Sequence, residues 1–131
     1  MQDAAPAFIQ SVGQIHISVK DFNRARAFYK DVLGLPMVFD IPEQKMAFFD
    51  CGGVRIYLGA PSSPEYAANS FLYYRVKDIE TAHRSLSQAG VEFLHDPRVV
   101  NRAQDHELWM AGFQDSEGNY AQLMEERALP Q

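Results

Sequence analysis

Two histidines in this chain could exchange protons with a bound molecule. His16 lies in an apolar run over residues 14–18, and His106 lies in the ionisable triplet Asp105-His106-Glu107. An imidazole has an ordinary pKa of about 6.5, so burial or a nearby carboxylate can move its titration across neutral pH. If both reach one ligand, they can serve as acid and base, and with Glu107 they can instead begin a metal site. The catalytic candidates are therefore His16, His106 and Glu107, beside the alternatives of a hydrogen-bonded core histidine and a solvated turn.

The elements that must position these residues form an internal repeat. With a shift of 57 residues, the triplet Val19-Lys20-Asp21 falls on the identical triplet Val76-Lys77-Asp78. Each triplet follows an apolar run, and each Asp can cap a helix that ends at a glycine, Gly34 or Gly90. A unit of this kind must pack on its copy to bury its apolar face. We therefore expect two stacked modules with any shared pocket between them.

Short strands are predicted before and after each helix, so that each module has the order βαβββ and the fold class is α+β. The predicted strands that follow the helices cover residues 37–41, 46–49, 54–58, 91–94, 108–113 and 120–124, with a loop at 96–103 and a turn at 115–119. Module 1 covers about 10–59 and module 2 about 70–126. A proline-bearing connector over 60–69 joins them within one domain spanning 1–131.

Composition narrows the classes of partner. The formal net charge of −5 argues against nucleic acid, because phosphate binding relies on clustered Lys and Arg. Cys51 is the only cysteine, so no intrachain disulfide can form. The amino terminus has neither a basic start nor an apolar stretch for export, and no apolar run approaches the roughly 20 residues of a membrane span. We expect a cytoplasmic protein with no nucleic-acid and no membrane partner.

Three strings resemble the vicinal oxygen chelate superfamily. They are IHISVKDF at 15–22, AFYKDVLGL at 27–35 and DSEGN at 115–119. That superfamily includes glyoxalase I, bleomycin-resistance proteins, fosfomycin-resistance enzymes, methylmalonyl-CoA epimerase and extradiol dioxygenases. The resemblance covers about residues 10–126 and implies two βαβββ modules whose sheets curl into a half-open barrel around one cavity. Because the superfamily contains isomerases, lyases, oxygenases, transferases and binding proteins, the resemblance does not fix the function.

The resemblance also implies where metal ligands would stand. Metal-dependent relatives carry them at the positions that Gln14, Tyr57, Phe71 and Gln122 occupy here. Hard divalent cations need carboxylates or imidazoles, which two amides, a phenol and a phenyl ring cannot replace. We therefore expect no cofactor and no metal at these positions. The alternative is one divalent metal ion at a displaced site around His16 and Glu107.

Alternation along the strands extends this set of cavity residues. If Gln14 points into the cavity, His16 does so too, because side chains two apart share a face of a strand. His106 leans the same way by alternation from Met110, unless a β-bulge reverses it. Aromatic walls with a few amide and imidazole groups suit a flat, apolar ligand, although the same residues could be core packing. The predicted ligand-binding residues are Gln14, His16, Tyr57, Phe71, Tyr73, His106, Tyr120 and Gln122.

These observations favour metal-independent binding of a small apolar or aromatic molecule, as in bleomycin-resistance proteins. The alternative is a glyoxalase-like or dioxygenase-like lyase, isomerase or oxygenase that uses His16 with His106 and Glu107 as a base or a displaced metal site. A pure protein-interaction module would leave the inward polar residues unexplained. Because a half-open barrel exposes strand edges, which proteins tend to cover, we also expect a homodimer.

Overall fold

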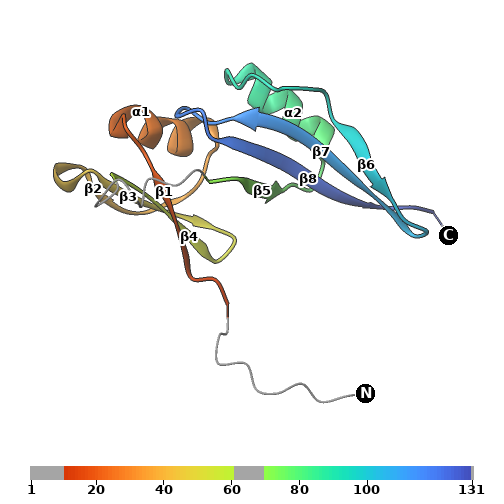
Figure 1. Ribbon diagram of the computed structural model, residues 1–131, viewed down its shortest axis with the longest axis horizontal. Helices are drawn as coiled ribbons and strands as arrows, with labels where there is room; N and C mark the ends of the chain where they lie inside the picture. Colours follow the sequence, from red (N-terminus) through yellow and green to blue (C-terminus); the bar gives the residue numbers. More distant parts are fainter. Residues whose placement is uncertain (1–10, 61–69, 131) are drawn as a thin grey trace, which may run out of the picture.

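The computed structural model describes residues 11–60 and 70–130, which form two modules with the same order of elements (Figure 1). The first contains β1 (Gln14–Ser18), α1 (Phe22–Ala27), β2 (Met37–Ile41), β3 (Met46–Cys51) and β4 (Val54–Gly59). The second contains β5 (Leu72–Arg75), α2 (Ile79–Gln88), β6 (Arg98–Arg102), β7 (His106–Gln114) and β8 (Tyr120–Ala128). A π-helical turn (Phe28–Val32) continues α1, and a 3₁₀ turn (Pro42–Gln44) joins β2 to β3.

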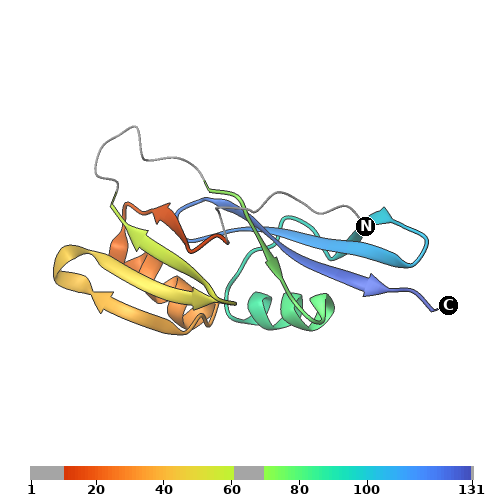
Figure 2. The same cartoon turned by 90° about the horizontal axis from the view of Figure 1, so that it is seen from below.

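Each module builds its own four-stranded sheet. The strand orders are β1-β4-β3-β2 and β5-β8-β7-β6, and in each sheet the first strand runs parallel to its neighbour while the other pairs are antiparallel. Figure 2 shows the two sheets side by side and not joined into one. The predicted α+β fold, two βαβββ modules in a half-open barrel, is confirmed, and the barrel is not closed.

The helix ends follow the predicted signals. Asp21 Oδ1 accepts a hydrogen bond from the Arg24 backbone N–H at 3.1 Å, and Asp78 Oδ1 accepts one from the Thr81 backbone N–H at 3.2 Å. Gly34 after the first helical segment has φ 73°. This left-handed conformation favours glycine because it has no Cβ.

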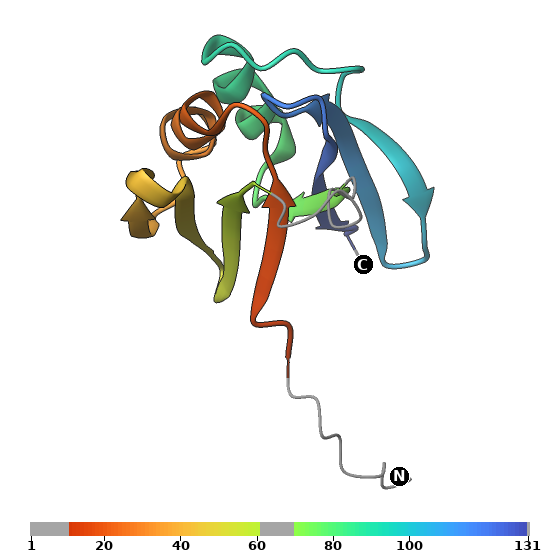
Figure 3. The ribbon, with the colours of Figure 1, turned by 60° about the vertical axis from the view of Figure 1, so that its left-hand side comes forward.

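Both helices lie on the same side of the sheets (Figures 1 and 3). The buried apolar clusters include residues of the helices and of the sheets, so the core lies between them. Ile17, Ile56 and Phe49 from the first sheet are at most 2% exposed beneath α1. Phe28 and Leu33, which follow α1, pack against the buried clusters of both modules. The opposite side of each sheet, called the open face below, therefore carries the side chains that alternate with the core residues.

A turn of the second module holds the first helix. The buried Tyr29 hydroxyl donates to Asp115 Oδ2 at 2.7 Å. Asp115 Oδ1 accepts from the backbone N–H groups of Glu117 and Asn119, both at 2.8 Å. The Glu117 carboxylate in turn accepts from Arg24 Nη2 at 3.1 Å and from the Lys20 backbone N–H. The predicted turn 115–119 thus closes its own backbone and joins the two modules.

One strand of the second module differs from the prediction. Residues 91–94 are not a strand, and Phe93 makes only a single bridge with Phe113. The missing strand is instead β6, inside the segment predicted as the loop 96–103. A tight turn, closed by the hydrogen bond from the Ala103 N–H to the His106 carbonyl at 2.8 Å, folds β6 back on the start of β7. β6 therefore pairs with the edge of β7 that β8 leaves open.

The predicted connector lies, from residue 61 to 69, outside the described residues. Within the described ranges, no helix is long and apolar enough to cross a membrane.

Candidate functional site

Four rings form a continuous row across the open face of the first sheet, called here the aromatic row. His16 on β1 stands opposite Tyr57 on β4, Tyr57 opposite Phe48 on β3, and Phe48 opposite Phe39 on β2. The successive ring centroids are 4.6, 4.4 and 6.0 Å apart. Sequence reasoning found His16 and Tyr57 but missed Phe48 and Phe39. The signal available was the alternation of β3, in which Phe48 precedes the buried Phe49.

The row combines stacked and edge-on contacts. Tyr57 stacks on Phe48 with an angle of 19° between the ring planes. His16 meets Tyr57 at 79° and Phe39 meets Phe48 at 86°, so an edge-on ring closes each end. Aromatic pairs prefer these arrangements over a face-to-face sandwich. Because Phe39 is 52% exposed, this end of the row presents aromatic surface that no described residue covers.

Gly59 makes room for the central ring of the row. A Cβ built on Gly59 would lie 2.8 Å from Tyr57 Cε1, closer than real Cβ atoms approach other atoms. The Tyr57 ring therefore leans along its own strand over Gly59. A side chain at position 59 would have to push the ring away.

A cation lies at one end of the row. The Arg55 guanidinium carbon is 5.5 Å from the centroid of the Phe39 ring. Among the described residues, no carboxylate oxygen lies within 4 Å of the Arg55 guanidinium. Its cross-strand neighbour Asp50 instead accepts a hydrogen bond from the Gly53 N–H at 3.2 Å in the hairpin turn. Sequence reasoning assigned no role to Arg55.

His16 is an exposed residue of β1, but its contact with Tyr57 removes part of the imidazole ring from water. Removal from water disfavours the charged imidazolium, so the pKa of His16 lies below its usual value. The neutral imidazole is then the dominant form at neutral pH, and it can accept a proton or a hydrogen bond from a ligand. Gln14, the neighbour of His16 on the same face, is exposed at the start of β1 and stands opposite Arg55.

The open face of the second sheet carries the other predicted residues. Phe71 and Tyr73 stack with centroids 5.3 Å apart, and both are about half exposed, as is Tyr120 at the start of β8. Tyr73 stands opposite Gln122, and Gln122 stands opposite Gly112. The buried Oε1 of Gln122 has no hydrogen-bond partner among the described residues. The predicted residues therefore divide into two groups, one on each sheet.

His95 joins the second group, although sequence reasoning gave it no role. Its Nε2 accepts the Gly112 backbone N–H at 3.3 Å, and its Nδ1 lies 2.8 Å from the Asp96 carbonyl, which makes Nδ1 the protonated nitrogen. A Cβ on Gly112 would lie 3.4 Å from His95 Nε2 and 3.8 Å from the Gln122 carboxamide carbon. The only signal in the sequence for this close contact of His95 was the glycine at position 112, which stands opposite the predicted ligand residue Gln122.

His106 and Glu107 lie on opposite faces of β7. The pairing of β7 with β8 is regular from end to end, so alternation places His106 on the open face with Met110. His106 Nδ1 lies 2.8 Å from Asp105 Oδ1, and this contact lowers the pKa of the Asp105 carboxyl. On the helix side, Glu107 accepts from Arg102 Nε at 2.7 Å and from Trp109 Nε1 at 3.1 Å. Neighbouring positions on this strand thus place the two candidates in different surroundings.

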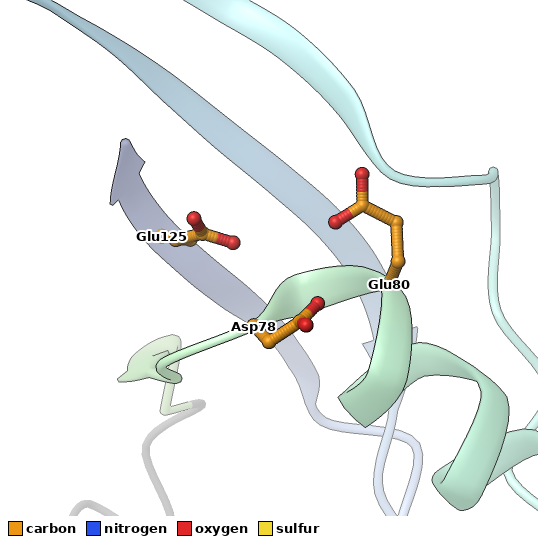
Figure 4. Close-up of side chains that lie close together, drawn as sticks. All are labelled: Asp78, Glu80 and Glu125. Carbon is orange, nitrogen blue, oxygen red and sulfur yellow. The ribbon is translucent and has the colours of Figure 1, made fainter. Parts of the chain in front are cut away.

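Within residues 11–60 and 70–130, one group of three carboxylates lies close enough together to suggest a metal site. Asp78, Glu80 and Glu125 offer oxygens within 4.8 Å of one another (Figure 4). Every member already has a partner. Asp78 caps α2, Glu125 accepts the Ile79 N–H at 2.9 Å, and Arg127 donates to both glutamates. The group secures the start of α2 to β8, and it does not include His16, His106 or Glu107.

An open hollow of about 420 Å³ lies at the seam between the modules. Of the predicted ligand residues, only Tyr73 lines it. Cys51 stands at its edge, where burial and then the nearby Asp50 raise the pKa of the thiol. The remaining lining residues are Ile15, Gly52, Val54, Ile56, Leu72, Tyr74 and Arg75.

Comparison with known families gives a match over almost the whole described chain. A model of the Glyoxalase/Bleomycin resistance protein/Dioxygenase superfamily matches residues 11–123. The uncharacterised protein YraH of Bacillus subtilis (strain 168) is 29% identical over 126 residues, which cover 84% of this chain and 94% of YraH.

Solved structures share the fold at lower sequence identity. A lactoylglutathione lyase from Agrobacterium tumefaciens superposes with a TM-score of 0.73 and 20% identity, covering 89% of this chain and 94% of the lyase. TnmS3, an antibiotic binding protein from Streptomyces sp. CB03234, superposes with a TM-score of 0.71 and 20% identity, covering 92% of this chain and 99% of TnmS3. At this identity both comparisons show the fold alone.

Proposed function

Because the chain belongs to the Glyoxalase/Bleomycin resistance protein/Dioxygenase superfamily, we propose that it binds a small, largely apolar or aromatic molecule without a metal ion. The observation that carries this proposal is the aromatic row on the open face of the first sheet. Exposed aromatic rings are costly in water, and a planar ligand can recover that free energy by stacking and burial. An antibiotic-binding protein with the same fold supports a binding role.

The positions that hold metal in metal-dependent relatives argue for metal-free binding. Gln14 and Gln122 offer neutral amides, and the Tyr57 ring packs between His16 and Phe48. The Oε1 of Gln122, which has no partner among the described residues, is a weak ligand for a metal ion but a good acceptor for a ligand N–H or O–H group. We assign Gln122 and Tyr73 to the ligand's polar edge on the second sheet.

We also propose that two copies of the chain complete the site. β1 and β5 each end a sheet on one side, and no described strand pairs with that outer edge. The two open faces carry complementary halves of the predicted site, and a two-fold pair would cover both edges and both faces. The proposal treats both modules as one domain, because Phe28 and Leu33 pack on both cores.

A second candidate is a lyase or isomerase that uses His16 as a base. The lowered pKa of His16 favours it, because a neutral imidazole at neutral pH can accept a substrate proton. A lactoylglutathione lyase with the same fold gives the type of reaction. Under this alternative, the ligand would be turned over and His16 would be needed for the reaction more than for affinity.

Calorimetric titration of chelator-treated protein with naphthalenemethanol, a neutral planar probe, tests the proposal. We expect saturable binding that added Zn²⁺, Mn²⁺ or Ni²⁺ does not strengthen. His16→Ala should weaken it about five- to hundredfold, since loss of one buried hydrogen-bonding partner costs about 1–3 kcal/mol. His83→Ala is the matched control. His83 lies on the helix side, where the centroid of its ring is 4.3 Å from that of Phe93. Binding that requires added metal would overturn the proposal.

A further inference from the structure

On the basis of the proposed binding function, we propose that the ligand is a planar aromatic molecule with an acidic group. The aromatic row holds its rings, and Arg55 binds its negative charge. Phe39, Phe48 and Arg55 thereby join the site. The first sheet holds the ligand's rings and its acidic group, and Gln122 and Tyr73 of the second sheet contact its remaining polar edge.

The four rings of the aromatic row form a broad apolar platform. Tyr57 and Phe48 stack on one another almost in parallel, 4.4 Å apart on adjacent strands, so the open face receives the edges of these two rings. His16 and Phe39 extend the aromatic surface at each end. A surface of four adjoining rings matches a fused-ring ligand better than a single small group, because burial free energy grows with the apolar area covered.

The residues beside the row are charged on one side only. The cross-strand neighbours on one side are Ser18, Gly59 and Met46, which are uncharged. On the other side they are Gln14, Arg55 and Asp50. The two charges therefore fall on the same side of the row, and only one of them turns toward the rings.

Arg55 points toward the rings, whereas Asp50 points away from them. Asp50 turns into the β3–β4 hairpin, where it accepts the Gly53 N–H. Arg55 leans over the Phe39 ring and forms no ion pair with any described carboxylate. A guanidinium that rests on an aromatic ring is partly desolvated and keeps its planar donors available for a carboxylate. It would repel a cationic ligand from the same place.

A matched pair of probes tests the inference. Naphthoate and naphthalenemethanol share their rings and differ in charge, so their affinities separate the contribution of Arg55 from that of the aromatic row. We expect wild-type protein at low salt to bind naphthoate about three- to tenfold more tightly than the alcohol, a preference that falls as NaCl is added. Arg55→Gln should remove the preference, because naphthoate loses its charge partner and is weakened about three- to tenfold more than the alcohol. Arg84→Gln, an exposed change on α2, is the control.

The outcomes separate this inference from the proposed function. Equal affinities for the two probes in wild-type protein, or equal losses for both in Arg55→Gln, would refute the acidic ligand while leaving aromatic binding intact. If Phe48→Leu weakens neither probe, the aromatic row is not the platform. If neither probe binds, the proposed function fails together with the inference.

Discussion

Alternation along the strand could predict the face on which His16 lies, but not the ring that it contacts. Its position on β1 fixes the face on which it lies, and its cross-strand partner Tyr57 fixes the ring that partly buries it. Alternation predicted the first feature, because His16 is two residues from Gln14 and therefore shares its face of the strand. The second depends on the register between β1 and β4, which a single sequence does not specify.

The pKa of His16 gives the first prediction. Its folded-state pKa lies below the unfolded value of about 6.5, so between the two values the unfolded chain binds more protons. The free energy of unfolding should therefore fall as the pH is lowered from about 6.5 through the folded pKa, and His16→Gln should reduce that fall. NMR titration of the His16 ring is the measurement. A midpoint at or above 6.5 would contradict the burial effect.

Gly59 gives the second prediction. Gly59→Ala should displace the Tyr57 ring, because the new Cβ would stand 2.8 Å from Cε1. We expect both naphthalene probes to bind at least several-fold more weakly and the near-ultraviolet circular dichroism of the stacked rings to change. Gly13→Ala, where a Cβ meets nothing within 4 Å, is the control. Unchanged probe affinity in the folded Gly59→Ala protein would show that the position of Tyr57 does not matter.

At the level of elements, what could be predicted depended on whether the signal was local. The caps at Asp21 and Asp78 and the glycine helix ends are local features, and the structure has them as predicted. β6 was missed because its pairing with β7 depends on a turn at 103–106 that carries no glycine or proline. Residues 91–94 have strand-like composition, but they reach only the far end of β7 at Phe113. Composition alone does not reveal which of two segments pairs with the edge of β7.

The link between α1 and the turn 115–119 gives the third prediction. Burial raises the pKa of Tyr29 well above its usual range, so its hydroxyl remains a donor to Asp115. Tyr29→Phe should lower the free energy of unfolding by about 1–3 kcal/mol, the value of a buried hydrogen bond to a charged group. Tyr120→Phe, which alters a half-exposed ring, should cost far less. Equal denaturation midpoints for both variants would remove this role from the turn.

At the level of the whole molecule, the structure divides the predicted site between two open faces. Gln14, His16 and Tyr57 lie on the first sheet. Tyr73, His106, Tyr120 and Gln122 belong to the second sheet, and Phe71 directly precedes its strand β5. Alternation predicts which side chains share a face of a strand. It carries no information on the distance between two sheets, so the sequence could not decide whether both groups meet in one chain.

A homodimer is the fourth prediction. Two-fold pairing would cover the outer edges of β1 and β5, with which no described strand pairs, together with exposed rings such as Phe71 and Tyr73. We expect light scattering at micromolar concentration to give twice the chain mass. A monomeric mass under these conditions would leave the open faces uncovered and would refute the shared site.

The most direct test of the account is to map the bound probe onto the sheets by NMR. Chelator-treated, isotopically labelled protein would be titrated with naphthalenemethanol while the backbone amide signals are followed. The account predicts saturable shifts that are largest in β1, β3 and β4, around His16, Phe48 and Tyr57. Shifts concentrated around Leu72 and Tyr74 would place the ligand in the seam between the modules and contradict the claim that the aromatic row is the binding surface.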